Sequence, residues 1–466
     1  MRQWMVAAKK ADFYAIAEKF HVDPVVARII RNREVIGEKN IRIYLGGNLS
    51  DLSDPHQMKD MDRLVEILAQ KIRKQVHIRI IGDYDVDGVT SSHLFLTALR
   101  RVGAKVDVVI PHRIQDGYGL SLHLLQQAKE DGVDTILTCD NGIAAIDEIA
   151  WAKAQKMTVL VTDHHAVPFE EHEGRRTEKK SLADAVVNPH QQDCGYPYKE
   201  LCGAGVAWNV IRVLYENYDM DKREAEDLLD FVAMATVCDV MSLTGENRIL
   251  VKEGLKRIRH TKNIGLQALM QACNVQPENI SAYHFGYVLG PCVNATGRLD
   301  TARHALRLFE TGQETEAEEI ARDLVDLNQE RKELTLQGVE MAKKLCEEGG
   351  YENDPVLVLF LPDVHESIAG LIAGRIREMY NRPVFVLTRG EEGVKGSGRS
   401  TENYSMYENM CGCAELFTKF GGHPMAAGLS LPEENVEKFR RKINENCPLT
   451  VEEVCPDIHI DMAMPV

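Results

Sequence analysis

Five short apolar runs, separated by segments with helical periodicity, constrain the fold of this chain more than any other feature. The runs cover residues 76–81, 105–110, 134–138, 157–162 and 184–188. They are rich in Val and Ile and are short, which is typical of buried strands. Strands that alternate with helices form βαβ units and a parallel sheet. The sequence therefore predicts an α/β fold with a doubly wound parallel sheet.

Polar residues follow these predicted strands at the points where the strands end. An acidic residue also follows a helix predicted over residues 228–237. In open parallel sheets, ligands bind in the crevice beyond the carboxyl ends of the strands. We therefore expect these polar side chains to meet at one edge of the sheet. They are Asp83 and Asp85 after the first strand, Asp140 after the third, Asp163, His164 and His165 after the fourth, and Asp239 after the helix.

Several carboxylates in one crevice repel one another unless cations lie among them. Carboxylate and imidazole ligands suit Mn²⁺, with Mg²⁺ or Zn²⁺ as alternatives. Two such ions bridged by a shared carboxylate would form a two-metal hydrolytic site. The candidate ligands are Asp83, Asp85, Asp140, His164 and Asp239.

The roles of two further carboxylates and of the paired histidines depend on their neighbours in the chain. Asp87 directly precedes Gly88 and a predicted helix, so we expect its carboxylate to cap that helix rather than bind a cation. Asp163 is better placed to orient a neighbouring imidazole than to be a ligand. Adjacent histidines alone would suggest a surface loop. Because His164 and His165 directly follow a predicted strand and Asp163, we expect them to be ligands.

The remaining sequence suggests further domains, because 466 residues exceed one hydrophobic core. We expect a helical lead-in over residues 1–75 and the first α/β domain over residues 76–312. A charged helix is predicted over residues 313–348. Its apolar residues recur about every 3.5 residues, which suits a helix that connects two domains. A smaller α/β domain is predicted over residues 349–447, and residues 448–466 read as the start of a further region.

Two glycine-rich segments, residues 395–400 and 421–428, lie in the second predicted domain. Among their glycines are Ser397, Arg399, Ser400 and His423. Glycine lets backbone amides approach an anion, and an arginine can bind a phosphate with both arms of its guanidinium group. The alternative is a pair of tight turns with one exposed arginine.

Composition limits the location and the partners of the protein. There is no apolar run of membrane-spanning length, and the first residues are too polar for a signal peptide. The eleven cysteines show no framework spacing, which predicts reduced thiols in a cytoplasm and no membrane partner. The formal net charge of −16 argues weakly against a protein that wraps duplex DNA.

Taken together, the motifs resemble those of the DHH phosphoesterases. The similarity lies in Gly-Asp-Tyr-Asp-Val-Asp-Gly at residues 82–88, residues 138–143, residues 161–165 and Cys238-Asp239. The second domain is similar to their DHHA1 partner at residues 396–400 and 421–423. Residues 111–119, 201–206 and 294–298 resemble, within this superfamily, the RecJ family of single-strand-specific 5′→3′ DNA exonucleases. The resemblance covers residues 75 to 447.

The resemblance implies two Mn²⁺ or Mg²⁺ ions, with Mn²⁺ preferred and with Asp140 bridging them. It assigns His165, supported by Asp163, to the scissile phosphate. It also implies single-stranded DNA as substrate, a role in DNA repair and recombination, and a single-strand-binding protein and a helicase as partners. The residues that would grip the DNA backbone and its 5′ end, in a groove between the domains, are Asn294, Arg298, Ser397, Arg399, Ser400 and His423.

The sequence departs from the family pattern at two places. Many superfamily members have a histidine two residues before the first motif aspartate, where this chain has Ile81. One metal would therefore lose a protein ligand. RecJ-family members also carry a C-terminal OB-fold, a domain that binds nucleic-acid strands. We therefore expect this chain to be truncated or to be a shortened relative, and to bind DNA less well.

Two other functions stay open at this point. One is a DHH phosphodiesterase that acts on short oligonucleotides or cyclic dinucleotides. The other is a non-catalytic DNA-binding or replication-scaffold protein, against which the intact set of Asp and His residues argues.

Overall fold

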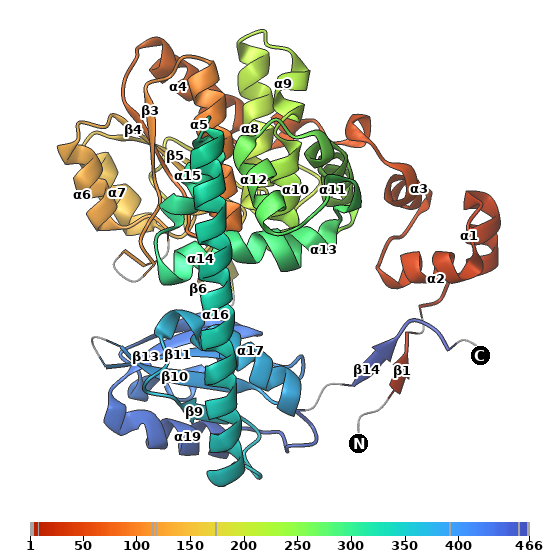
Figure 1. The fold of residues 1–466 in the computed structure, drawn as a ribbon, viewed down its shortest axis with the longest axis vertical. Helices are drawn as coiled ribbons and strands as arrows, with labels where there is room; N and C mark the ends of the chain where they lie inside the picture. Colours follow the sequence, from red (N-terminus) through yellow and green to blue (C-terminus); the bar gives the residue numbers. More distant parts are fainter. Residues whose placement is uncertain are drawn as a thin grey trace. The chain divides into compact units, whose positions relative to one another are not determined.

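The computed structural model describes residues 4–7, 9–113, 116–117, 119–172, 175–390, 393–454 and 457–463. The motif at residues 111–119 contains Ile114, Gln115 and Tyr118, which lie outside the described residues. The chain forms two units, one of residues 35–328 and one that joins residues 1–34 to residues 329–466 (Figure 1). The domain limits expected from the sequence stay a prediction.

The first unit contains the predicted parallel sheet. Its strand order is β3-β2-β4-β5-β8, and each neighbouring pair is parallel. Strand β2 comes first in the chain, and β3, the second, lies on one side of it. The next strand in the chain, β4, lies on the other side of β2. The crevice where the strand order reverses therefore lies between β2 and β4, where ligands bind in such sheets. The strands are β2 (Ile78–Ile81), β3 (Val106–Val109), β4 (Thr135–Cys139), β5 (Thr158–Thr162) and β8 (Ala185–Val187).

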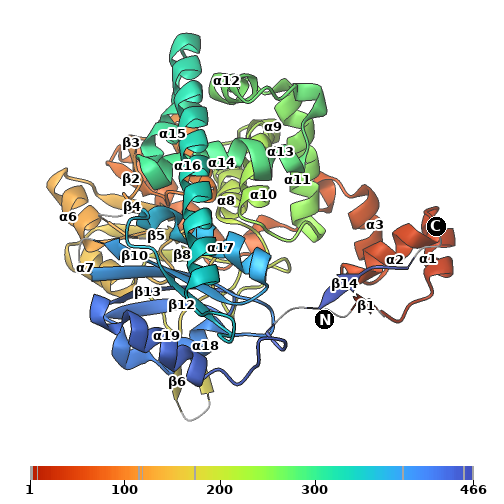
Figure 2. The ribbon, with the colours of Figure 1, turned by 60° about the horizontal axis from the view of Figure 1, so that its bottom comes forward.

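Helices cover both faces of this sheet, as the doubly wound fold predicts (Figure 2). Successive strand residues point to opposite faces. Ile80 and Leu137 pack in the core formed with α4 (Met61–Arg73), α5 (Val86–Arg101) and α8 (Gly203–Asn217). Ile81 and Ile136 pack on the other face with α6 (Leu122–Glu130) and α7 (Ile146–Ala154).

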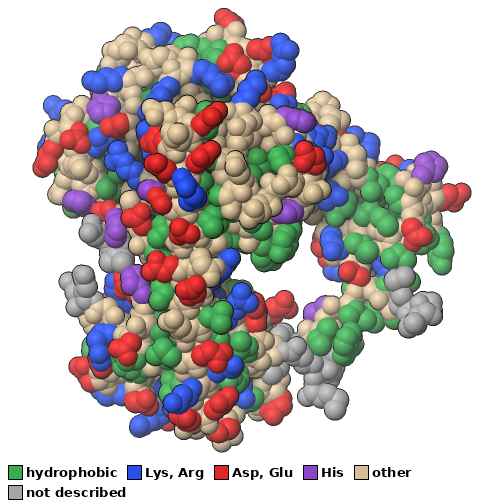
Figure 3. Space-filling model, in the orientation of Figure 1, with side chains coloured by type: hydrophobic (Ala, Val, Ile, Leu, Met, Phe, Trp, Pro, Cys, Tyr) green, Lys and Arg blue, Asp and Glu red, His purple; other side chains and the backbone are tan. Residues whose placement is uncertain are grey.

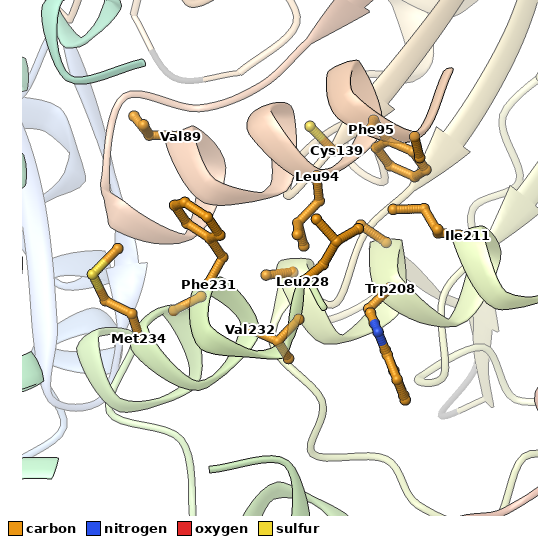
Figure 4. Close-up of a cluster of buried hydrophobic side chains, with 14 of the residues drawn as sticks. Val89, Leu94, Phe95, Cys139, Trp208, Ile211, Leu228, Phe231, Val232 and Met234 are labelled. Atoms are coloured by element: carbon orange, nitrogen blue, oxygen red, sulfur yellow. The ribbon is translucent and has the colours of Figure 1, made fainter. Parts of the chain in front are cut away.

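The centre of the first unit is a layer of apolar helices. Helix α10 (Leu229–Cys238) is apolar around most of its circumference and its residues 229–236 are buried, as expected for a core helix. Figure 4 shows Leu94 of α5 and Phe231 of α10 within the shared core. A β-carbon at Gly254 of α11 (Gly245–Arg257) would lie 2.2 Å from the carbonyl oxygen of Leu229, so α11 packs closely on α10. This packing places Asp239 at the end of α10.

The remaining helices of the first unit lead to one long helix. They are α12 (Ile264–Ala272), α13 (Ala282–His284), the π-helix η5 (Phe285–Leu289), α14 (Gly290–Leu299) and α15 (Ala302–Glu310). The helix predicted over residues 313–348 is α16 (Glu314–Glu348). Its residues Ile320 and Leu324 are buried in the core of the first unit, and Val339 and Ala342 in that of the second.

The second unit contains a five-stranded sheet of order β12-β13-β11-β10-β9. Strands β9 (Leu357–Phe360) and β10 (Val384–Gly390) are parallel, and the other pairs are antiparallel. Helix α17 (Ala369–Tyr380) lies between β9 and β10 in the chain, as expected for the smaller α/β unit predicted in this region. The other elements are β11 (Gly393–Arg399), α18 (Met406–Cys411), β12 (Lys419–His423), β13 (Ala426–Leu431) and α19 (Val436–Glu445).

The glycine-rich segments are mainly strands, and not the turns or the anion-binding loops expected from their composition. Strand β11 pairs with β10 and β13, so its backbone amides take part in sheet hydrogen bonding. A β-carbon at Gly396 would lie 2.4 Å from a methyl group of Leu387, and one at Gly398 would lie 2.6 Å from the sulfur of Met406. These glycines leave room for side chains that pack onto the strand.

Residues near the two chain ends pair with one another. Strand β1 (Trp4–Val6) is parallel to β14 (Ile458–Ile460). The expected helices of residues 13–30 are α1 (Phe13–Phe20) and α2 (Pro24–Asn32), followed by α3 (Glu38–Gly46). Neither β1 nor the hairpin of β6 (Phe169–His172) and β7 (Arg175–Glu178) was predicted. Among the described helices, none has the length and the apolar character needed to span a bilayer.

The carboxyl group of Asp230, at the start of α10, gives a test of this packing. Burial raises the pKa of Asp230 to about 6, although the Thr261 hydroxyl donates a 2.6 Å hydrogen bond to it. The folded state therefore binds more protons than the unfolded state between pH 4 and 6, so stability falls as pH rises through this window. We expect Asp230→Asn to remove this fall and to stabilise the protein at pH 8 by about 1–3 kcal/mol.

Denaturant unfolding at pH 4 and pH 8 measures this effect. The exposed Asp326 of α16 provides the control, because Asp326→Asn should leave the pH dependence unchanged. Equal pH dependence in the wild type and in Asp230→Asn would contradict the prediction.

Candidate metal centre

The loop between β2 and α5 places three carboxylates in different roles. Asp85 has an extended backbone (φ −92°, ψ −176°), and its Oδ1 accepts a 3.0 Å hydrogen bond from the Gly88 amide, so it caps α5. Asp87 lies inside the first turn of α5, and its carboxylate accepts hydrogen bonds of 2.6 and 2.7 Å from the amides of Gly203 and Ala204. The prediction that Asp87 caps the helix that follows it was wrong. Helix α5 begins before Asp87. The Asp87 carboxylate instead accepts hydrogen bonds from backbone amides at the N-terminus of α8.

Asp83 is buried at the end of β2 and is 2% exposed. Its Oδ1 has no hydrogen-bond partner among the residues that the structure describes. Burial and the neighbouring charge of Asp85 raise the pKa of Asp83 well above its usual range. An ionised carboxylate in this position needs a compensating positive charge.

Asp140 occupies the turn after β4 in a left-handed conformation, with φ 62°. Its Oδ1 lies 3.1 Å from Nε2 of His164. Burial, followed by the charges of Asp87 and Asp85, raises the pKa of Asp140 well above its usual range. A non-glycine residue in this backbone region is uncommon, and such conformations concentrate at functional sites.

Asn141 holds the ends of the two central strands together and was not among the predicted site residues. Its Nδ2 donates hydrogen bonds to the carbonyl oxygens of Ile81 (3.0 Å) and Cys139 (2.9 Å). The side chain of Ile81 packs in the core with α6 and α7. The position two residues before Asp83 is therefore part of the apolar core.

Asp163 orients the pair of histidines that follows it. Its Oδ1 lies 2.8 Å from Nδ1 of His165 and accepts a 2.7 Å hydrogen bond from the His164 amide. Burial acts to raise the pKa of Asp163, but the hydrogen bond with His165 brings it below the usual value. Burial likewise acts to lower the pKa of His165, but Asp163 and nearby carboxylates raise it to about 9. Burial lowers the pKa of His164, which favours the neutral imidazole that binds metals.

The predicted ligands converge in three overlapping groups whose candidate ligand atoms lie within 4.8 Å of one another. Asp140 and His164 each belong to two groups. Burial and the charges of Asp87 and Asp85 also raise the pKa of Asp239 to about 8. The groups are Asp83, Asp85 and Asp140; Asp87, His164 and Asp239; and Asp140, His164 and His165.

This donor set fits divalent cations. It combines carboxylates and imidazoles, contains no thiolate and includes the partnerless oxygen of Asp83. All five predicted ligands belong to it, and Asp87 is an addition. The sequence signal for Asp87 is its spacing of two from Asp85, although its position before Gly88 favours a helix cap.

Helix α14 brings two predicted substrate-binding residues to the loop after β2. Asn294 accepts a 3.1 Å hydrogen bond from the Val86 amide at the start of α5. A β-carbon at Gly297 would lie 2.4 Å from the carbonyl oxygen of Tyr84, so α14, which also carries Arg298, contacts this loop. Arg113, which follows the second predicted strand, also contacts this loop: its guanidinium lies over the Tyr84 ring, 4.7 Å from the centroid.

In the second unit, three of the four predicted substrate-binding residues share one face of the sheet. Ser397 and Arg399 alternate along β11, and Arg399 lies 3.4 Å from the Ser397 hydroxyl. Ala426 of β13 pairs with both Arg399 and His423, so these side chains point to the same side. Ser400 does not join them, because its hydroxyl is buried and donates a 2.5 Å hydrogen bond to the Tyr404 carbonyl.

Gly370, in the first turn of α17, was not predicted as a site residue. A β-carbon there would lie 2.8 Å from the Ser397 hydroxyl and 2.9 Å from the Arg399 guanidinium. The arginine and the serine therefore lie at the N-terminus of α17, where the helix dipole favours an anion. No sequence pattern links Gly370 to β11, because the contact is tertiary.

Gly203 offers a direct test of the metal centre. A β-carbon at Gly203 would lie 2.6 Å from that of Asp140, so Gly203→Ala must displace this carboxylate. We expect Mn²⁺ affinity, measured by calorimetric titration, to fall about 10–100-fold. At Gly205, two residues along α8, a β-carbon would meet its nearest atom at 3.4 Å, so Gly205→Ala should bind Mn²⁺ normally. Equal affinities of the two variants would contradict the prediction.

Comparisons with known proteins agree with this fold. Residues 77–236 match the DHH family, N-terminal domain, and residues 353–447 match the DHHA1 domain. The chain is 36% identical over 440 residues to the single-stranded-DNA-specific exonuclease RecJ of Haemophilus influenzae, covering 91% of this chain and 74% of the relative. It is 33% identical to RecJ of Bacillus subtilis, covering 96% of this chain and 56% of the relative.

A solved structure shows the same architecture. RecJ from Thermus thermophilus in complex with Mn²⁺ matches with a TM-score of 0.80 and 27% identity, covering 99% of this chain and 65% of that one. This chain thus spans 56% of the length of the Bacillus relative and 65% of the Thermus one. From the family models and the identity to the Haemophilus relative, we conclude that the chain belongs to the RecJ family and contains its DHH and DHHA1 domains.

Proposed function

We propose that this protein is a metal-dependent exonuclease that hydrolyses single-stranded DNA from the 5′ end to mononucleotides. The observation that carries the proposal is the group of buried carboxylates around Asp140. Burial and the charges of the neighbouring carboxylates raise their pKa values. The candidate ligand atoms of each group lie within 4.8 Å of one another. The membership of the RecJ family, whose named relatives act on single-stranded DNA, supports the substrate.

The residues proposed to hold two divalent cations are Asp83, Asp85, Asp140, His164 and Asp239, with Asp140 shared. Asp140 suits a shared ligand because it belongs to two of the overlapping groups. The proposed ions are Mn²⁺, which the carboxylate and imidazole ligands favour, or Mg²⁺. The Thermus relative was solved with each of them. When bound, such ions lower the pKa of a water molecule and compensate the charge of the reacting phosphate.

His165 is proposed to contact the scissile phosphate. Its side chain is 42% exposed, unlike that of His164, and Asp163 holds its ring through Nδ1. The carboxylate of Asp163 favours the cationic imidazole, which donates a charge-assisted hydrogen bond to an anionic oxygen. Asp163 is thus proposed as a positioning residue for His165.

Phosphates of the strand are proposed to bind at two places. Asn294 and Arg298 of α14 lie in the helix that contacts the loop after β2. Ser397, Arg399 and His423 share one face of the second sheet, with the N-terminus of α17 beside the first two. We assign this second place to the 5′-phosphate, because a guanidinium and a helix N-terminus together suit a terminal dianion.

The wider setting is proposed from family resemblance alone. It comprises a cytoplasmic location, a role in DNA repair and recombination, and contacts with a single-strand-binding protein and a helicase. Co-purification of tagged protein with these two partners would test the last point.

A hydrolysis assay tests the main proposal. With Mn²⁺, the protein should release mononucleotides from a 5′-labelled 40-mer, but not from its duplex, and should prefer the 40-mer to a dinucleotide. Asp140→Ala removes the shared ligand, and we expect kcat to fall at least about 1,000-fold.

The exposed Asp326 on α16 provides the control, since Asp326→Ala removes a carboxylate far from the ligand set in sequence. It should retain wild-type activity. Preference for the dinucleotide would overturn the exonuclease proposal, and activity that survives in Asp140→Ala would overturn the metal site.

A second kinetic experiment tests the 5′-phosphate site. Arg399→Ala should lower kcat/KM on a 5′-phosphorylated strand about 10–100-fold, because a charge-assisted pair is lost. On the same strand with a 5′-hydroxyl, the loss should be much smaller. Arg389→Ala is the matched control, because Arg389 is exposed on β10 and pairs with Glu433. Equal losses on both strands would show that Arg399 does not read the 5′-phosphate.

A further inference from the structure

Two tyrosines on the surface of the first unit have no part in the site described above. Tyr283 is 62% exposed and Tyr287 is 72% exposed. Their rings stack on one another, with centroids 5.2 Å apart and planes inclined by 23°. Figure 3 shows exposed hydrophobic side chains gathered on the surface around α13. Such aromatic area contributes little to folding, because the rings remain in water.

These tyrosines belong to a segment that is fixed to the metal centre. Tyr287 lies in the π-helix η5, a rare form that often marks functional sites. The Cys238 thiol donates a 3.3 Å hydrogen bond to the Phe285 carbonyl of η5. A β-carbon at Gly290 would lie 2.3 Å from the Cys238 sulfur, so the segment packs closely on the end of α10. Cys238 is the residue before the metal-centre residue Asp239.

The same segment continues directly into α14. That helix carries Asn294 and Arg298, the residues proposed to bind the strand backbone. The two tyrosines are therefore linked to the metal centre through α10 and to the backbone-binding residues through α14.

The charge of the segment also suits a polyanion. The chain carries a formal net charge of −16, yet residues 279–299 contain no Asp or Glu and include Arg298. A phosphodiester backbone would meet little repulsion there. With few cations available, binding must take energy from another source. Stacking of bases on aromatic rings supplies it for unpaired strands of any sequence.

We propose that Tyr283 and Tyr287 form a stacking platform for unpaired bases of the strand that enters the metal centre. The identity of this ligand rests on the proposed function. In a duplex, the bases stack on one another and their faces are covered, so the platform accepts single strands only. It thereby adds a binding element for the single strand outside the metal centre.

A binding experiment that needs no hydrolysis tests the platform. The parent is Asp140→Ala, which keeps the strand intact, and affinity is followed by fluorescence anisotropy. One probe is a 3′-labelled dT 15-mer, and the other has the same backbone with abasic residues throughout. Adding Tyr283→Ala and Tyr287→Ala should weaken binding of the dT strand about tenfold. The two Tyr→Phe changes, which keep the rings, should restore it.

The abasic strand separates stacking from backbone contacts. Without bases, the parent and the double alanine variant should bind it equally. Tyr14, which is 78% exposed on α1, provides the matched control, because Tyr14→Ala should not alter either affinity. Equal losses on the two probes, no loss on the dT strand, or no binding by the parent would each overturn the proposal.

The platform and the nuclease activity fail in different ways. A protein that binds dT through the tyrosines but hydrolyses no strand with Mn²⁺ would refute the proposed function and leave the platform standing. A protein that hydrolyses single strands but shows no tyrosine effect on dT affinity would do the reverse.

Discussion

Mutual repulsion among buried carboxylates is the constraint on which the first unit depends. The structure relieves part of it with hydrogen bonds. The amides of α8 satisfy Asp87, the Gly88 amide satisfies Asp85, and His165 together with backbone amides satisfies Asp163. Asp83, Asp85, Asp140 and Asp239 nevertheless keep raised pKa values. Their burial is costly unless cations bind, so the fold holds a site whose ligands are assembled in advance.

Close backbone packing around these carboxylates explains several glycines. A β-carbon at Gly88 would lie 2.5 Å from the Asp83 amide, and one at Gly203 would lie 2.6 Å from Asp140. At both positions a helix N-terminus approaches the acidic loops, and the α8 amides also bind Asp87. The positive ends of these helix dipoles therefore stabilise negative charge in the crevice. The same glycines that allow the approach thus serve the electrostatics of the site.

The second unit supplies the opposite charge. Arg399 and His423 share a sheet face, and Arg399 lies with Ser397 beside the first turn of α17. In the proposed function, the carboxylates of the first unit hold cations and the cationic, helix-terminal surface of the second unit binds phosphate. The exposed tyrosines of the first unit add a surface for bases, which neither charged region recognises.

The sequence by itself determined the parallel sheet, the order of its strands along the chain and the convergence of the five predicted ligands at one edge of the sheet. Apolar runs of strand length and polar residues directly after them are local patterns, and the rule for parallel sheets brings those residues together. Only the tertiary structure decided which groups those carboxylates meet. Asp87 could not be assigned from sequence, because its partners at Gly203 and Ala204 are remote in the chain. The same holds for Gly370 beside Arg399, for the burial of Ser400, and for the pairing of β1 with β14. Each of these depends on a contact between distant segments, which no local periodicity records.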